Sequence, residues 1–173
     1  CGGDSDSGDG AGLLCEIPWS FFKKVWPEIN SSHKSNGIGM VFMPNDLNQR
    51  KKAKEIFEDE AKKLSLSSKG WRKVPVEPDV LGPLARSTVP FIEQWLIEGN
   101  QQEENLENVL FKLRKKIQNR FSNSLENIEG DPYIASLSTR TIVYKGMVRS
   151  HVLSKFYQDL KDKSFAISFA IYH

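Results

Sequence analysis

The sequence predicts a domain of the α/β or α+β class, with six or seven short strands separated by four helices. Three observations support this prediction. Apolar residues recur at helical spacing over two long segments, and short apolar or alternating runs that are typical of strands lie before, between and after them. In addition, 39% of the 173 residues are hydrophobic and 27% are charged, a mixture that can bury a core and differs from that of a disordered chain.

The first elements in chain order are a loop, a strand and a short helix. Residues 1–12 are rich in Gly, Asp and Ser and therefore predict a loop, and Leu13–Ile17 predicts a short strand. Pro18 suits the first turn of a helix that Pro27 ends, and a polar loop follows over residues 30–36. The helix would carry Phe21, Phe22 and Val25.

The middle of the chain predicts two further strands around a long helix. Gly37–Met43 is almost continuously apolar and predicts a buried strand. Asp46 is a candidate N-cap for a helix that extends to about Leu66. Trp71–Val76 alternates like an edge strand, because Pro75 would interrupt a central one. The apolar face of the helix is Ala53, Ile56, Phe57, Ala61 and Leu64.

The second half predicts a loop over residues 77–90 and then a strand, Phe91–Ile97. The clearest helix covers Gln102–Phe121, where Leu106, Val109, Leu110, Leu113, Ile117 and Phe121 fall on one stripe. After a turn at Asp131-Pro132, the expected elements are the strands Tyr133–Leu137 and Thr141–Tyr144, a helix Ser150–Leu160 that buries Val152, Leu153, Phe156, Tyr157 and Leu160, and a strand Phe165–Tyr172.

Charge and composition exclude several classes of function. The formal net charge is +2 and the pI is about 8.5, too weak a basic bias to indicate a nucleic-acid or membrane partner. We see no apolar run near the ~20 residues that cross a bilayer, and no targeting peptide. The two cysteines, Cys1 and Cys15, cannot build a disulfide framework and are expected to be reduced thiols. The histidines, His33, His151 and His173, are too far apart for a zinc site.

The acidic, glycine-rich start of the chain suggests two ligands, and we reject both. A calcium-binding EF-hand loop starting at Asp4 would need Gly at its sixth position and Glu at its twelfth, where Asp9 and Cys15 stand. A phosphate cradle at Gly8–Gly12 would need a preceding strand and a following helix. A tight turn that uses positive φ angles is the preferred interpretation.

Cys1, the segment Ser138–Thr141 and His151 are further candidates for a functional site. Cys1 could act as an N-terminal nucleophile with its own amine as base, but a polar glycine loop is a poor support for attack geometry, so we favour an ordinary loop cysteine. Ser138–Thr141 could hold an anion through its hydroxyls and Arg140, although a solvated turn is the more common situation. His151 is interpreted as a capping or surface residue. The tryptophans are interpreted as core: Trp19, Trp26, Trp71 and Trp95.

Several segments, taken in order, resemble the N-terminal glutaminase domain of the large chain of glutamate synthase. The most specific is Tyr133–Ser138 followed by Thr139–Met147. The others are Asp4–Gly12, Ile17-Pro18-Trp19 with Phe21-Phe22, Gly37–Met40 with Phe42-Met43-Pro44, Gly70-Trp71-Arg72 with Val74-Pro75-Val76, Phe156–Leu160 and Phe169–His173. The sequences Ile17-Pro18-Trp19 and Ala170–His173 resemble more closely those of the ferredoxin-dependent type of plastids and cyanobacteria.

This resemblance implies an α+β fold of the four-layer αββα N-terminal-nucleophile hydrolase type. It also implies a cysteine nucleophile that hydrolyses L-glutamine to glutamate and ammonia. The ammonia passes through an internal tunnel to a synthase domain of the same chain, which aminates 2-oxoglutarate. That domain uses FMN, an iron–sulfur cluster and electrons from reduced ferredoxin or NAD(P)H. The implied compartment is the cytoplasm or the plastid stroma.

The departures from the family pattern decide the site prediction. The family's nucleophile strand and His-Arg-Gly precede the position that Cys1 matches. The glutamine-holding Arg-Tyr-Ser-Thr-Asn and the oxyanion Asn-Gly follow His173. We therefore assign no catalytic, cofactor or metal residue to this chain. We expect residues 1–173 to be an internal, incomplete piece of the domain that is inactive and poorly stable alone. The alternatives are a non-catalytic remnant or interaction module, and a divergent hydrolase that uses Cys1.

Overall fold

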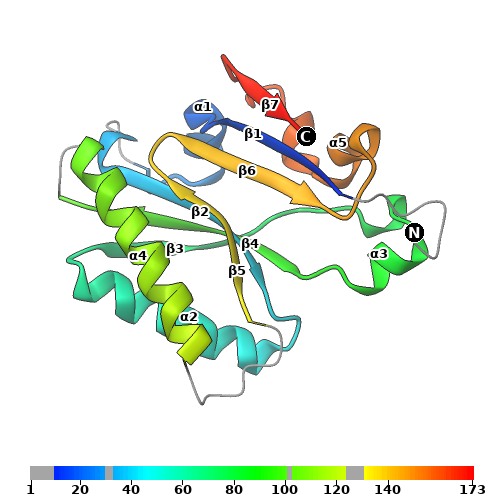
Figure 1. The fold of residues 1–173 in the computed structure, drawn as a ribbon. Coiled ribbons are helices and arrows are strands. Elements are labelled where there is room, and N and C mark those ends of the chain that lie inside the picture. Colours follow the sequence, from blue (N-terminus) through cyan, green and yellow to red (C-terminus); the bar gives the residue numbers. More distant parts are fainter. Residues whose placement is uncertain (1–9, 30–32, 101–102, 124–130) are drawn as a thin grey trace.

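The computed structural model describes residues 10–29, 33–100, 103–123 and 131–173, which form two antiparallel sheets and five α-helices. Figure 1 shows α2 (Leu47–Lys63) and α4 (Glu103–Asn123) against one face of the larger sheet, while the smaller sheet lies across its other face. The observed class is thus α+β, as the sequence predicts. None of the helices in these ranges is long and apolar enough to span a bilayer.

The larger sheet has four strands in the order β3-β4-β2-β5. They are β2 (Asn36–Met43), β3 (Ser67–Lys73), β4 (Phe91–Glu98) and β5 (Tyr133–Ser138), and each confirms a predicted strand within a few residues. β3 lies at an edge, as the sequence predicts, but it is displaced from the predicted Trp71–Val76 and ends before Pro75. Side chains on one face pack under α2 and α4 in a first core, which contains Val41, Phe57, Trp95, Ile97, Leu106, Leu110, Leu113 and Ile117.

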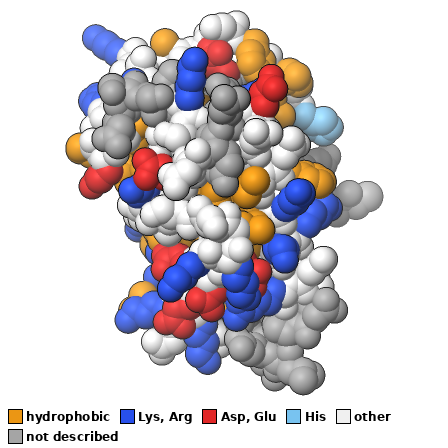
Figure 2. Space-filling view, turned by 90° about the vertical axis from the view of Figure 1, so that its left-hand side faces the viewer, with side chains coloured by type: hydrophobic (Ala, Val, Ile, Leu, Met, Phe, Trp, Pro, Cys, Tyr) orange, Lys and Arg blue, Asp and Glu red, His pale blue; other side chains and the backbone are white. Residues whose placement is uncertain are grey.

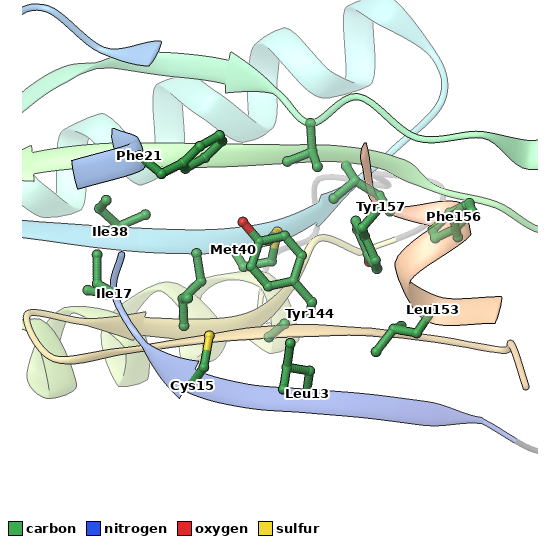
Figure 3. Packing of buried hydrophobic residues seen from close by; sticks show 14 of the residues in the cluster. Leu13, Cys15, Ile17, Phe21, Ile38, Met40, Tyr144, Leu153, Phe156 and Tyr157 are labelled. Atoms are coloured by element: carbon green, nitrogen blue, oxygen red, sulfur yellow. The ribbon is translucent and has the colours of Figure 1, made fainter. Parts of the chain in front are cut away.

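The smaller sheet has the order β6-β1-β7, with β1 (Ala11–Glu16), β6 (Thr141–Gly146) and β7 (Ala170–Tyr172). Alternate residues of β1 are buried, because one of its faces packs on the larger sheet. Figure 3 shows this second core between the sheets, where side chains from β1, β2, β6 and the segment after β6 meet. Its members include Leu13, Cys15, Ile17, Phe21, Ile38, Met40, Tyr144, Leu153, Phe156 and Tyr157.

Two helix predictions are confirmed down to their first turns. α1 (Trp19–Val25) follows Pro18 and buries Phe21 and Phe22. At the start of α2, the Asp46 carboxylate accepts hydrogen bonds from the amides of Asn48 and Gln49, at 2.9 and 2.8 Å. α2 ends at Lys63 rather than at Leu66, because Ser65 takes a left-handed conformation with φ of 57°. This turn redirects Leu66 into the first core.

Five sequence predictions are wrong in detail. The expected loop over 77–90 contains the 3-10 turn η2 (Pro78–Val80) and the helix α3 (Pro83–Ser87), where Pro83 occupies the first helical position. Gly12, expected in the leading loop, lies within β1. Of the tryptophans, Trp95 and Trp26 are buried, whereas Trp19 and Trp71 are only half-buried.

The fourth and fifth wrong predictions concern a helix and a strand near residue 173. The expected helix over 150–160 is a series of short turns, η3 (Ser150–Val152), α5 (Leu153–Phe156) and η4 (Gln158–Lys161). The series breaks because Tyr157 leaves the helical conformation and pairs with Val76 in an isolated bridge. The expected strand over 165–172 shrinks to β7, since the Asp162 side chain binds Ser164 and stabilises a turn there.

The two specific strands of the family resemblance, β5 and β6, are consecutive in sequence but belong to different sheets. β5 pairs with β2, and β6 pairs with β1, so the turn between them crosses from one sheet to the other. The Ser136 hydroxyl accepts a hydrogen bond from the amide of Val143 at 3.1 Å, which ties the two strands together.

Candidate functional site

A pocket of about 890 Å³ opens at one end of the two sheets. On one side it is bounded by the start of β1 and the end of β6, and on the other by the end of β2, the start of β4 and α3. Figure 1 shows these elements converging near the N-terminal end of the described chain. Its walls are mainly apolar, and they include Phe42, Met43, Leu81, Ile92, Val148 and Phe156. A concave, mostly apolar cavity of this size is typical of a small-molecule site.

The beginning and the end of the described chain meet at the pocket. Gly12 and His173 exchange two backbone hydrogen bonds, at 3.1 and 3.0 Å, and both residues line the cavity. Gly10, just before, has φ of +129°, a conformation that L-residues with a side chain rarely adopt. The positive φ of Gly10 agrees with the predicted use of glycine in this loop, whereas the tight turn itself falls on residues that the structure does not describe.

The polar groups of the pocket include Lys145 and Tyr133. The Lys145 ammonium donates a hydrogen bond to the Tyr133 hydroxyl at 2.6 Å and lies 4.3 Å from the centre of its ring. The backbone carbonyl of Lys145 accepts a hydrogen bond from the Tyr157 hydroxyl at 2.7 Å. Burial raises the pKa of Tyr157, so this hydroxyl stays a donor throughout the physiological range. Tyr133 of the larger sheet thus holds the cationic side chain, and Tyr157 holds the backbone of the same residue.

Between the sheets, four side chains form a polar network in which Gln94, Tyr144 and Asp159 are buried and Arg72 is half-buried. The Asp159 carboxylate accepts hydrogen bonds from both terminal nitrogens of Arg72, each at 2.8 Å. Gln94 accepts from Arg72 at 2.6 Å, and its amide donates to the Tyr144 hydroxyl at 3.0 Å and to Asp159 at 3.4 Å. Tyr144 donates to Asp159 at 3.3 Å. Burial, and then the Asp159 charge, raise the pKa of Tyr144, so the hydroxyl keeps its proton.

The predicted anion-binding turn does hold an anion, but that anion comes from the chain itself. The Glu107 carboxylate of α4 accepts hydrogen bonds from the backbone amide and the hydroxyl of Thr139, at 2.6 and 2.7 Å. The Ser138 hydroxyl accepts from the amides of Arg140 and Thr141. Because Ser138 and Thr139 are buried, the alternative of a solvated turn is wrong for them as well.

Of the two cysteines in the sequence, the structure describes only Cys15. Cys1, the candidate N-terminal nucleophile, lies outside the described residues, as do Asp4 to Asp9. Cys15 is a free thiol that is fully buried between the sheets. Burial, helped by the neighbouring Glu16 charge, raises the pKa of Cys15 to about 11. A buried neutral thiol is a poor nucleophile, so Cys15 has the properties of a core residue.

The remaining candidates for a site are the histidines and groups of metal-binding side chains. His151 is exposed in η3, which confirms the surface assignment, and the side chain of His33 lies outside the described part. Within that part, no group of three or more His, Cys, Asp or Glu side chains could hold a metal ion. Cys15 is the single cysteine that the structure describes, so the described residues do not fit an iron–sulfur cluster, which needs several thiolates.

Sequence reasoning missed both the pocket and the network between the sheets. The Arg72–Asp159 pair joins residues 87 positions apart, and no local pattern signals such a contact. The sequence around Asp159 carries no special signal either, because Lys155, Gln158 and Lys161 make this segment mixed rather than apolar. Figure 2 shows basic and acidic side chains interspersed on the face that it presents, so this face carries both signs of charge.

Comparison with known proteins gives a consistent result. A family model described as "Glutamine amidotransferases class-II" matches residues 1–173. The chain is 40% identical over 179 residues to ferredoxin-dependent glutamate synthase 1 of Arabidopsis thaliana, a match that covers the whole chain and 11% of that protein. It is 39% identical to ferredoxin-dependent glutamate synthase 2 of Synechocystis and 38% identical to the large chain of the NADPH glutamate synthase of Bacillus subtilis. In each case it spans 11% of the relative's length.

Proposed function

The chain belongs to the class-II glutamine amidotransferases, and on that premise we propose that residues 1–173 are an internal part of the glutaminase domain of a glutamate synthase. The complete domain hydrolyses L-glutamine to glutamate and ammonia. A synthase domain of the same protein then uses the ammonia to aminate 2-oxoglutarate. Together the two reactions assimilate ammonia and synthesise glutamate.

One structural observation supports this function most directly, the pairing of Gly12 with His173 at the pocket. In the family pattern, the nucleophile strand and His-Arg-Gly come before the loop that contains Gly12. The glutamine-holding segment comes after the stretch matched by Phe169–His173. Since Gly12 and His173 are hydrogen-bonded to each other, these two flanking segments would enter the same region. The pocket then forms one wall of the glutamine site.

The chain's own residues are proposed to shape this site rather than to make or break bonds. Amide hydrolysis of this kind needs a cysteine thiolate to attack the carboxamide, and backbone or side-chain donors to stabilise the oxyanion. The family positions of these groups lie outside residues 1–173. The contribution of this chain is to hold the flanking segments, through β1 and β7, and to enclose the site with apolar side chains that exclude water.

A fourth layer of the αββα fold is part of the same proposal. The described residues provide one helical layer and two sheets. The outward side of the smaller sheet carries half-buried Leu14 and Val143, and Ile171 beside them is 62% exposed. A second helical layer from the remainder of the glutaminase domain would cover this apolar surface.

Cofactors and partners of the complete enzyme follow from the relatives. Several relatives are named ferredoxin-dependent and one is named for NADPH, so the proposed electron donor is reduced ferredoxin or NAD(P)H. FMN and an iron–sulfur cluster would bind in the synthase domain, since the described residues do not fit a cluster. The proposed compartment is the cytoplasm or, if the protein is plastid-encoded or imported, the plastid stroma.

A chimeric enzyme tests this function. Residues 1–173 replace the matched segment of the Synechocystis ferredoxin-dependent enzyme, and ammonia release from glutamine is measured beside the unmodified enzyme. We expect the chimera to keep glutaminase activity within about tenfold, because the segment supplies the scaffold and the host supplies the reacting groups. A chimera that unfolds at the temperature of the host enzyme but releases no ammonia would contradict the proposal.

A further inference from the structure

The polar network of Arg72, Gln94, Tyr144 and Asp159 is the strongest feature that the proposed function leaves unexplained. Its four members come from β3, β4, β6 and η4, so it connects both sheets with the segment after β6. Asp159 is 3% exposed and accepts four hydrogen bonds within this group. The carboxylate is therefore fully satisfied without water.

Stability alone is a weak reason to bury such a pair. Removing two charges from water is costly, and replacing a buried ion pair by apolar side chains of similar size is often neutral or stabilising. A saturated network does, however, select one arrangement of the elements that it joins, since any other arrangement leaves a buried charge without partners. The effect of the network therefore depends on which part of the molecule it holds in place.

The part that it fixes is the irregular wall of the pocket. Residues 147–161 contain only short turns, and they are attached to the loop after β3 by two backbone bonds, from Gln158 to Pro75 at 3.1 Å and from Glu77 to Phe156 at 2.9 Å. Phe156 lines the pocket, three residues before Asp159. Asp159 anchors the end of this segment to the larger sheet, and Tyr157 anchors its middle to Lys145.

We propose that Arg72 and Asp159, with Gln94 and Tyr144, are positioning residues that set the place of Phe156 and Lys145 in the wall of the glutamine site. This inference rests on the proposed function. None of the four touches the reacting atoms. They act through the wall, because a displacement of about 1 Å in an active site can reduce the rate about 100-fold. Loss of the network should therefore reduce catalysis beyond any effect on folding.

A paired substitution separates positioning from stability. The single variant Asp159→Asn and the double variant Arg72→Met with Asp159→Leu are made in the chimeric enzyme, and kcat, KM for glutamine and the thermal transition are measured. The matched control is Glu98→Gln, which removes a partly exposed ion pair with Lys69 between β3 and β4. We expect the double variant to unfold near the unsubstituted temperature, yet to have kcat/KM for glutamine at least tenfold lower. Glu98→Gln should leave both unchanged.

Hydrogen exchange gives a second measurement that does not depend on activity. In Asp159→Asn, the amides of Glu77 and Gln158 should exchange at least tenfold faster, whereas the amide of Ile97 in β4 should keep its rate. If the double variant recovers kcat/KM together with thermal stability, or if Asp159→Asn accelerates exchange uniformly, the positioning role is refuted. If the unsubstituted chimera lacks glutaminase activity, the proposed function fails, and the exchange pattern alone decides whether the network positions the wall.

Discussion

Replacing Glu107 by alanine should destabilise the fold strongly, because this residue connects α4 to the turn between the two sheets. Its carboxylate accepts hydrogen bonds from the amide and the hydroxyl of Thr139, at 2.6 and 2.7 Å. Thr139 is 4% exposed, so water could replace these bonds only in part. The turn that contains Thr139 carries the chain from β5 in one sheet to β6 in the other.

The expected magnitude follows from these two bonds. A hydrogen bond to a charged group contributes about 1.5–3 kcal/mol, and an unsatisfied buried donor costs about 1–3 kcal/mol. Since Glu107 is itself half-buried, water can satisfy part of the loss, and Glu107→Ala should lower the free energy of unfolding by about 2–4 kcal/mol. Glu107→Gln keeps an acceptor oxygen and should cost roughly half as much.

Urea unfolding followed by tryptophan fluorescence measures this effect, since buried Trp95 stacks on half-buried Trp71 at 5.0 Å and both rings contact Phe57 of α2. Glu104→Ala is the matched control, because Glu104 is exposed on the same helix; it should change the free energy of unfolding by less than about 0.5 kcal/mol. Equal effects of Glu104→Ala and Glu107→Ala would refute the reasoning. So would restoration of Glu107→Ala to full stability by added phosphate, which would show that the turn recruits an external anion.

Further predictions concern packing, pH and activity. Gly37→Ala would place a methyl group 2.4 Å from the buried Cδ1 of Leu110, so it should lower the free energy of unfolding in urea by about 1–3 kcal/mol. The double variant with Leu110→Ala should lose less than the sum of the two single losses. The pKa of the Cys15 thiol is raised from 9.0 to about 11, so the folded state holds the thiol proton more tightly than the unfolded state does. The free energy of unfolding should therefore fall as pH rises from 9.0 to about 11, by up to roughly 3 kcal/mol. Cys15→Ala should show a smaller fall over the same range. Hydrogen bonds from Lys63, and then from Arg120, lower the pKa of Glu60; this contribution should be present above pH 4.5 and be lost as pH falls below it, and Glu60→Gln should remove that part of the acid sensitivity. The isolated 173-residue chain should release no ammonia from glutamine above a Cys1→Ala control, and any Cys1-dependent release would contradict this.

Most regular elements could be predicted because their residues carry a periodic signal. The apolar stripe of α4, the continuous run of β2 and the Asp46 cap of α2 are local patterns, and the structure confirms each of them. The segment 150–160 has the same apolar content, and it was predicted to be one helix. Its series of turns depends on contacts with Val76 and with the larger sheet, which lie far away in sequence.

The candidate site was less predictable for the same reason. Lys145, Phe156 and His173 come from three separate segments, and only the packing of the two sheets brings them to one pocket. Family resemblance supplied the function and the expectation that the reacting groups lie elsewhere. It did not indicate that Gly12 pairs with His173, which is the contact that relates the matched segments to each other.

Identification of the cysteine that reacts with a glutamine-mimicking chloroketone tests the central claim most directly. The chimeric enzyme is incubated with the reagent, digested and analysed by mass spectrometry, with a Cys1→Ala version in parallel. We expect a single adduct on the host enzyme's nucleophile, outside residues 1–173, and equal labelling in the Cys1→Ala version. An adduct on Cys1, with loss of glutaminase activity in Cys1→Ala, would contradict the account and would place the nucleophile within this chain.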